Sequence, residues 1–516
     1  MNVLVFSACV GSLLGLIVLF GFLRLSLGRS EIFFELVGLW IRPFLKRLFS
    51  STYAHNPAEM ANVLRRSGMQ RLVENELRAE GGSVVQRPMG SSRPLALLDE
   101  IAFDPAVLWR RPLAYDAKVE TQLVLGPKAQ KPLVLQIPLL LGAMGYGVAI
   151  SKPAAIALAK GAEQAGTAVN GGLGPFLPEQ RHACSRMIVQ FGRTQWGQDL
   201  IAVRQASMVE IQVGHGAWAA AGHRMSTDNL SEQTRADLRA ESARFIEVQA
   251  GFHDWPLPQA LPELVAFLRE QSGGVPIGIK LPASDDLEAD LRWVVESGVD
   301  VVTIDGNTGA TSGAPPLLSD TVGLPTIFAL QRAAAFWETH HLRGRVTLIT
   351  AGGLLTPEEA LKAMALGAEG VVMGTGPLFA LAHPQLSQLV PRFTPLELLW
   401  ESGWRKENLQ MDRAAEALAA FLLSSVDEMV IAMRALGKAR IATLSRDDLI
   451  ALTPQAATLL GLPPAWVTPT SSRAFSSTRQ DAQESLDLSR LQAEMSQLEQ
   501  QLPLLIARLE GQKDLL

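Results

Sequence analysis

Two glycine-rich loops between residues 345 and 376 have the composition of a phosphate-binding site. Val346 to Thr350 is a short, apolar, β-branched run typical of a buried parallel strand, and it ends in Ala351-Gly352-Gly353. Glu369 to Met373 predicts the next strand, which ends in Gly374-Thr375-Gly376. In a (β/α)8 barrel, the loops after the last two strands bind phosphate through backbone N–H groups and a helix N-terminus. Two ordinary tight turns are the alternative.

Three polar residues stand at predicted strands of the same kind. Lys280 is the only charge in the strand IGIKL, and burying its ammonium is costly unless it faces an anion. The alternative is a lysine that reaches solvent at a strand end. Gln190 ends another predicted strand and offers both a donor and an acceptor. Asp305 follows VVTI and either binds a ligand hydroxyl or ties down the glycine-rich loop behind it.

The surrounding segments predict the elements of an α/β fold. Thr356-Pro357-Glu358-Glu359 has the composition of a helix N-terminus, and Gly367 ends that helix. The apolar stretch 137–141 predicts a buried strand, followed by a glycine-rich loop and a helix over Lys152 to Gln164. The length of 516 residues accommodates a barrel of about 250 residues with appendages. We therefore predict a (β/α)8 TIM barrel over residues 138–400.

These segments resemble, in chain order, the FMN-binding barrel of glutamate synthase. The matching segments are GAMGYGVAIS at 142–151, NGG at 170–172, QFG at 190–192, VEIQVGHGA at 209–217, PIGIKL at 276–281, VVTIDGNTGATSGAP at 301–315, TAGG at 350–353 and ALGAEGVVMGTGPLFAL at 365–381. The resemblance covers roughly residues 95 to 460. It implies a flavin oxidoreductase acting on CH–NH2 donors, either in the reductive amination of 2-oxoglutarate to glutamate or in a related imine or amino-acid redox reaction.

The resemblance also implies roles for individual residues. Lys280 would face the N1 and O2 atoms of the reduced flavin, whose pyrimidine end is an anion, and Asp305 would bind a ribityl hydroxyl. Lys280 and His215 are the candidate catalytic residues. The implied FMN contacts are Ala143, Met144, Asn170, Gln190, Lys280, Asp305, Gly306, Gly352, Gly353, Gly374 and Thr375.

Several positions depart from the family pattern. Residues 381–384 carry no cysteine where the family has a cysteine-rich loop, so no iron–sulfur cluster is expected. NGG lacks the glutamate of the family's GEGG, and Thr308 replaces another glutamate. Gln212 and Trp218 stand where lysines are usual, which weakens the expectation of a dicarboxylate substrate. Either His215, Trp218, His223 and Arg224 build a different pocket over the flavin, or they pack as an ordinary loop.

The expected partners follow from what the sequence lacks. It shows no GxGxxG fingerprint, so electrons are expected from another protein or a transiently bound donor. It also shows no amidotransferase domain with an N-terminal cysteine, so ammonia is expected from solution or a partner. The net charge of −5, with both signs scattered, gives no footprint for nucleic acid. The alternative function is a catalytically altered FMN-binding or docking subunit of a membrane-associated complex.

The N-terminus predicts a membrane anchor. Met1 to Leu23 has no charged residue and, as a helix, would extend about 35 Å, enough to cross a bilayer. Basic residues follow this stretch and none precedes it, so a single-pass anchor over residues 1–28 would leave the catalytic domain in the cytoplasm, at the inner membrane. A cleaved signal peptide is the alternative. Residues 29–53 predict a membrane-surface or connecting helix.

The remaining segments are expected to be appendages. Residues 54–137 would lead into the barrel, 401–463 would form a helical extension with two helices from Ser424 onward, and 464–485 would be a linker. Residues 486–516 repeat leucine or methionine at coiled-coil spacing. That helix would self-associate, dock to a partner or pack on its own barrel.

Overall fold

The computed structural model describes residues 30–467, apart from short gaps at 51, 53–55, 57, 82–83, 88, 94–95, 310, 312 and 391. The chain divides into two compact units after Val85. The described part of the first unit consists of helices α2 (Ser30–Ser50) and α3 (Ala58–Gly81). α2 lies where a membrane-surface or connecting helix was predicted, and it continues through Pro43. α3 is kinked at Gly68, whose φ is 75°.

The predicted location at the inner membrane is corrected by the structure. Across the described ranges, every helix is too short or too polar to cross a bilayer. The stretch Met1 to Leu23, from which the anchor was predicted, lies outside the described residues, as do the final residues of the predicted linker and the whole predicted coiled coil.

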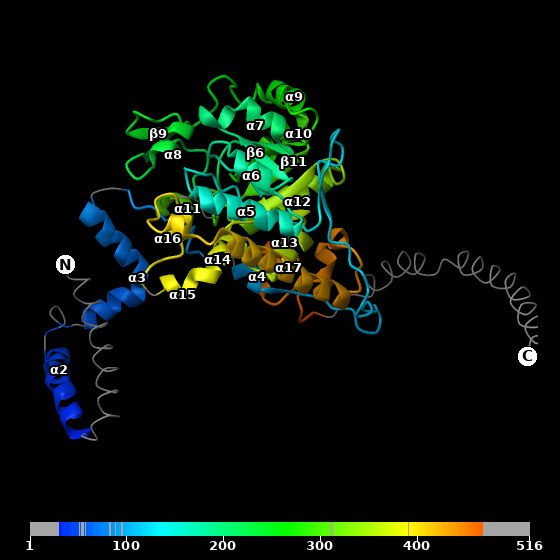
Figure 1. Ribbon diagram of the computed structural model, residues 1–516. Helices are drawn as coiled ribbons and strands as arrows, with labels where there is room; N and C mark the ends of the chain where they lie inside the picture. Colours follow the sequence, from blue (N-terminus) through cyan, green and yellow to red (C-terminus); the bar gives the residue numbers. More distant parts are fainter. Residues whose placement is uncertain are drawn as a thin grey trace, which may run out of the picture. The chain divides into compact units, whose positions relative to one another are not determined.

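An eight-stranded parallel sheet forms the centre of the second unit, in the order β4-β13-β12-β11-β10-β7-β6-β5 (Figure 1). Its outermost strands in this order, β4 and β5, follow one another in the chain, so the sheet curls into a nearly closed barrel. This confirms the predicted α/β, TIM-like fold. The strands are β4 (Leu139–Leu141), β5 (Val169–Asn170), β6 (Met187–Phe191), β7 (Met208–Gln212), β10 (Ile277–Pro282), β11 (Val301–Asp305), β12 (Thr347–Ala351) and β13 (Gly370–Met373).

A helix follows each barrel strand, as parallel pairing requires. The helices are α5 (Lys152–Ala165), α6 (Pro178–Ala183), α7 (Leu200–Gln205), α9 (Leu261–Gln271), α10 (Leu287–Glu296), α12 (Thr326–Thr339), α13 (Pro357–Ala365) and α14 (Thr375–Ala382). α13 begins with the predicted capping box: Thr356 accepts from the Glu359 backbone, and the Glu359 carboxylate accepts from the Thr356 N–H. Because this pattern is local, the sequence was sufficient to predict it.

A short hairpin closes the amino-terminal end of the barrel. β2 (Leu123–Leu125) pairs with β3 (Leu133–Leu135), and its leucines pack against Leu140, Ile188 and Ile349 of the barrel strands. Thr347 ties the hairpin to β12, because its hydroxyl accepts from the Gly126 N–H and donates to the Val124 carbonyl. The opposite, carboxyl-terminal end remains available for a ligand.

An insertion between β7 and α9 lies beside that carboxyl-terminal end. It contains β8 (His223–Ser226), α8 (Glu232–Asp237) and β9 (Phe245–Val248), and the two strands pair antiparallel. Figure 1 shows α8 and β9 together, projecting away from the sheet. The insertion brings side chains to the site that a minimal barrel lacks.

The C-terminal extension differs from the two helices predicted from Ser424 onward. A single helix, α17 (Met411–Ala435), runs through that residue and packs against α5. Its buried face includes Ala415, Leu418 and Leu422, which continue the apolar spacing N-terminal to the serines. Ser425 does not break the helix because its hydroxyl donates to the Phe421 carbonyl four residues earlier. The other described elements are α4 (Ala96–Asp99), β1 (Ile101–Phe103), α11 (Pro316–Thr321), α15 (Leu386–Leu389), α16 (Leu396–Leu399), β14 (Leu449–Ala451), α18 (Pro454–Leu460) and five 3₁₀ turns.

Candidate active site

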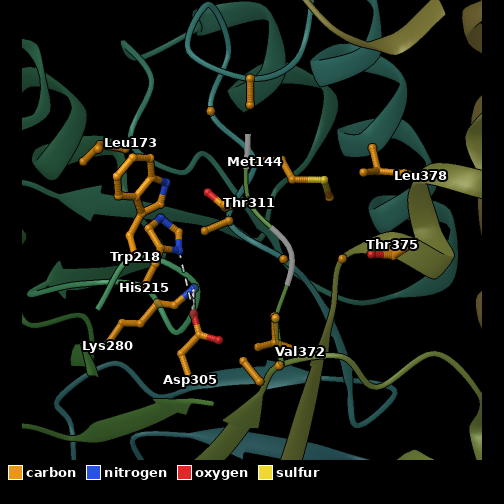
Figure 2. A pocket seen from close by; sticks show the side chains of 18 of the residues that line it. Met144, Leu173, His215, Trp218, Lys280, Asp305, Thr311, Val372, Thr375 and Leu378 are labelled. Atoms are coloured by element: carbon orange, nitrogen blue, oxygen red, sulfur yellow. Dashed lines mark ion pairs between the residues drawn. The ribbon is translucent and has the colours of Figure 1, made fainter. Parts of the chain in front are cut away.

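A cavity lies where the loops after the barrel strands meet. It encloses about 1030 Å³ of space, a volume that includes its solvent-open mouth. Its lining comes mainly from the loops after β4, β7, β11, β12 and β13, together with Lys280 of β10. Figure 2 shows Met144 between two groups of side chains, with Trp218, His215, Lys280 and Asp305 on one side and Thr375 and Leu378 on the other. The cavity therefore has two chemically distinct ends.

The first end, which we call the glycine end, is made by Gly352, Gly353, Gly374 and Thr375. Gly352 and Gly353 have φ angles of 119° and 80°, a region that favours glycine. A Cβ on Gly374 would meet no atom within 4 Å, so it would occupy space in the cavity. α14 begins at Thr375, and its first N–H groups have no partner within the helix. This combination of close backbone and free donors suits a phosphate.

The second end, which we call the side-chain end, contains a buried charge pair. Lys280 Nζ lies 2.9 Å from Asp305 Oδ2, and His215 Nδ1 lies 3.7 Å from the same oxygen (Figure 2). Neighbouring positions in the parallel sheet bring the two charged residues together, because Pro282 of β10 is in register with Asp305 of β11. Two residues 25 positions apart in the chain thus form a buried ion pair.

The charges set the protonation states of this cluster. Burial alone would lower the pKa of Lys280, but the carboxylates of Asp305 and Glu210 outweigh it and raise that pKa. Burial alone would raise the pKa of Asp305, but Lys280 and His215 hold it well below its usual range. Burial and the nearby Lys280 cation lower the pKa of His215 against the opposing effect of Asp305. At neutral pH the cluster therefore contains an ammonium, a carboxylate and an uncharged imidazole.

Glu210 is a buried charge that the sequence reasoning missed. Its carboxylate accepts hydrogen bonds from Asn170 Nδ2 at 2.9 Å, Gln190 Nε2 at 2.8 Å and Thr303 Oγ1 at 3.2 Å. It is the only charged residue in the strand MVEIQ, the same signal that singled out Lys280. Glu210 of β7 thus binds polar residues from three other barrel strands, β5, β6 and β11.

The structure brings most of the predicted site residues to one cavity. Nine of them line it, namely Ala143, Met144, His215, Lys280, Asp305, Gly352, Gly353, Gly374 and Thr375. Asn170, Gln190 and Gly306 are absent from the lining. Asn170 and Gln190 bond to Glu210, and Gln190 also lines a smaller hollow of about 330 Å³. The roles assigned to all of these residues remain predictions.

The residues that depart from the family pattern separate into three environments. Trp218 and His223 line the cavity and stack on each other, with ring centroids 4.1 Å apart and planes at 13°. Gln212 is fully buried, and neither of its amide atoms has a partner in the described part of the chain. Arg224 is exposed and pairs with Glu247 at 2.7 Å, so it does not share the cavity with the other residues of its group.

Candidate metal ligands are scattered among the described residues. In those ranges, no group of three or more His, Cys, Asp or Glu side chains is placed to hold a metal ion. Cys184 is buried, and burial raises the pKa of its thiol to about 11, which makes it a poor thiolate ligand. The absence of an iron–sulfur cluster stays a prediction.

Comparison with known proteins shows the family. The family model described as "Conserved region in glutamate synthase" matches residues 105–389, more than half of the chain. A glutamate synthase large subunit-like protein of Rhizobium meliloti is 28% identical over 397 residues, covering 73% of this chain and 89% of that protein. An archaeal-type glutamate synthase (NADPH) of Thermotoga neapolitana is 28% identical over 325 residues, covering 59% of this chain and 64% of that protein.

A further relative and one solved structure complete the comparison. The archaeal-type glutamate synthase (NADPH) of Dehalococcoides mccartyi is 31% identical over 252 residues, and the match spans half of its length. An (S)-mandelate dehydrogenase chimera is 15% identical with a TM-score of 0.48, covering 73% of this chain and 94% of that chain. That score is too low to support an inference. The match to the family's conserved region is sufficient by itself: the chain belongs to the FMN-binding glutamate synthase family of oxidoreductases.

Proposed function

We propose that this protein holds FMN in the barrel cavity and catalyses the oxidation of an amine to an imine or the reverse reduction. The observation that supports this most directly is the placement of the Lys280, Asp305 and His215 cluster in the same cavity as the glycine end. One end suits a phosphate and the other carries a cation for an anionic ring. FMN has both of these groups.

The residues present fit the cofactor. The backbone would hold the phosphate at Gly352, Gly353, Gly374 and Thr375. Glycine at position 374 leaves room for it, because an added Cβ there would extend into the cavity. Lys280 would neutralise the pyrimidine end of the reduced ring. When bound, FMN supplies the two-electron, hydride-transfer chemistry that amino acid side chains lack.

His215 is suited to hold and move the substrate's proton. It lines the cavity in its neutral form, and the nearby Asp305 carboxylate favours the tautomer with the proton on Nδ1. Nε2 is then free to take a proton from an amine, or to return one to an imine nitrogen. Asp305 acts through His215 and Lys280, orienting the first and balancing the charge of the second.

Reductive amination of 2-oxoglutarate requires groups that bind two carboxylates, but Gln212 and Trp218 occupy the positions where the family resemblance leads us to expect lysines. We therefore favour a related imine or amine over 2-oxoglutarate itself. Electrons would come from a partner protein or a transiently bound donor. Ammonia would come from solution or a partner.

Purification of the full chain, followed by its absorption spectrum and identification of the released cofactor, tests the proposal. We expect a flavin spectrum and about one FMN per chain. A colourless protein that also fails to take up added FMN would refute the proposed function.

A further inference from the structure

One wall of the side-chain end consists mainly of aromatic and apolar residues, in contrast to the charged pair of Lys280 and Asp305. The loop after β7 and the strand β8 contribute His215, Trp218, His223 and Met225, and Leu173 comes from the loop after β5. Figure 2 shows Trp218 beside Leu173 and above His215, across the cavity from Thr375. If the phosphate occupies the glycine end, this wall is where a substrate would bind.

This wall offers no free positive charge to a carboxylate. Among the described residues that line the cavity, Lys280 and Asp305 are the ionised ones, and they pair with each other at 2.9 Å. Burial, with a smaller contribution from the neighbouring His215, lowers the pKa of His223 to about 4, so this imidazole is neutral at pH 7.

Arg193 is a further buried cation, and it lies outside the lining. Its Nη1 donates to the carbonyls of Ala220 and Ala250 at 2.7 and 3.0 Å, whereas its Nε has no hydrogen-bond partner in the described part of the chain. A carboxylate held within the lining itself would lose its hydration without meeting an unpaired cation, which is unfavourable.

The same wall is well suited to a flat, apolar group. The Trp218 indole lies nearly parallel to the His223 ring, and together with Leu173 and Met225 they form an apolar surface. Such a surface favours stacking of another ring. His223 also lines the cavity, and its neutral imidazole can bond to one polar group of a ligand.

We infer that the substrate is an uncharged imine without a carboxylate, carrying a flat apolar group such as an aryl ring that stacks against Trp218, and that it bonds to His223. This inference rests on the proposed function, since the cofactor is what makes the compound a substrate. It narrows the substrate class and excludes dicarboxylates.

Benzamide and benzoate test the inference, because they share size and shape and differ in charge. Calorimetric titration of the full FMN-loaded protein at pH 7 should show benzamide binding at least tenfold more tightly than benzoate. 2-Oxoglutarate should bind more weakly than benzamide as well. Equal or tighter binding of either anion would overturn the inference.

Substitution of Trp218 separates stacking from charge. Trp218→Lys should weaken benzamide at least tenfold and strengthen benzoate, whereas Trp218→Phe should keep the wild-type order of affinities. If both variants leave both affinities unchanged, Trp218 is not part of the binding wall and the inference fails.

The flavin spectrum, recorded before each titration, separates this failure from a failure of the proposed function. If the protein lacks FMN, the proposed function fails, and tryptophan fluorescence of the flavin-free protein then follows the same two probes. Preference for benzamide in that form would still support the wall as a site for uncharged ligands, and preference for benzoate would refute it.

Discussion

The two ends of the cavity are made in different ways. The glycine end uses backbone groups from β12, β13 and the loops that follow them, all within residues 347–376. The side-chain end uses residues from β7 to β11 and the insertion between them, and sheet topology brings these together. A backbone site depends on whether a Cβ is present, whereas a side-chain site depends on the identity of each residue. The second can therefore change its ligand while the first keeps the cofactor.

The departures from the family pattern agree with this difference. The glycine end retains TAGG and GTG, the segments expected of the family, while Gln212 and Trp218 replace two expected lysines, and Trp218 lines the side-chain end. Substitutions at the first end should act on cofactor retention. Substitutions at the side-chain end should change the reduction potential of the flavin, the pH dependence of stability and the choice of ligand.

The largest effect is expected from Gly374→Glu at the glycine end. Its side chain would fill cavity space and place a carboxylate beside the phosphate, so FMN retention should fall by at least about a hundredfold, or roughly 2.8 kcal/mol. The flavin content of the purified protein measures this. Because Gly374 has an ordinary φ of −110°, the fold should tolerate the change better than at Gly353.

Gly374→Ala serves as the matched control, since a single methyl group adds no charge. It should lower FMN affinity by less than Gly374→Glu while the circular dichroism spectra of both variants match that of the wild type. Full flavin content in Gly374→Glu would show that the glycine end does not hold the phosphate.

Opposite shifts of the flavin reduction potential are expected from the two members of the buried pair. Lys280→Met removes a cation and should lower the potential, whereas Asp305→Asn removes an anion and should raise it. Two charges about 4 Å apart interact by about 4 kcal/mol at an effective dielectric of about 20. Because about 30 mV corresponds to about 1.4 kcal/mol for two electrons, shifts of tens of millivolts are expected in a spectroelectrochemical titration.

Each of these changes also leaves one buried charge without its partner. Loss of one member of a buried pair typically costs about 3–5 kcal/mol, so both variants should unfold at lower urea concentration. Unchanged potentials in both variants would show that the pair is remote from the flavin, and shifts of the same sign would show that these charges do not set the potential.

Much of the fold and of the glycine end was predictable because their signals are local. The capping box at Thr356, the strand before Gly352 and the strand before Gly374 each lie within a few consecutive residues. Lys280 was recognised as a single charge in an apolar strand. Its partner could not be identified from spacing, since the pairing with Asp305 depends on the register between β10 and β11.

Other features depend on long-range contacts that the sequence does not show. The role of Gln190 as a flavin contact remains a prediction, and the structure adds that its side chain bonds to Glu210 on the adjacent strand β7 and lies outside the lining of the main cavity. Glu210 itself was passed over, although its position in an apolar strand matched that of Lys280. Arg224 was grouped with His223 because they are adjacent, yet neighbouring strand residues face opposite sides.

A pH response is expected from the side-chain end. The pKa of His223 is lowered to about 4 in the folded protein, from about 6.5 in the unfolded chain. Between these values the unfolded chain binds more protons, so stability is retained above pH 6.5 and is lost as pH falls. His223 should account for up to about 2 kcal/mol of the stability lost between pH 7 and pH 5.

His223→Phe keeps a ring beside Trp218 and removes the titrating group. Urea denaturation of this variant and of the wild type at pH 7 and pH 5 measures the difference. The variant should lose less stability on acidification, and an equal loss in both proteins would show that His223 is already free to protonate in the folded state.

The smallest effect is expected from Tyr146→Phe, which acts on the link between the barrel and the insertion. The Tyr146 hydroxyl, in the loop after β4, donates to Asp237 of α8 at 2.9 Å. Removing this bond should cost about 1 kcal/mol, because Asp237 is partly exposed and water can replace the hydroxyl.

Flavin content of the Tyr146→Phe variant should stay unchanged, since the glycine end is untouched. The affinity for benzamide should fall a few-fold, because the insertion carries His223 and Met225 in the opposite wall. If FMN were lost together with benzamide, the two ends would act as one site, and the independence argued from their construction would be wrong.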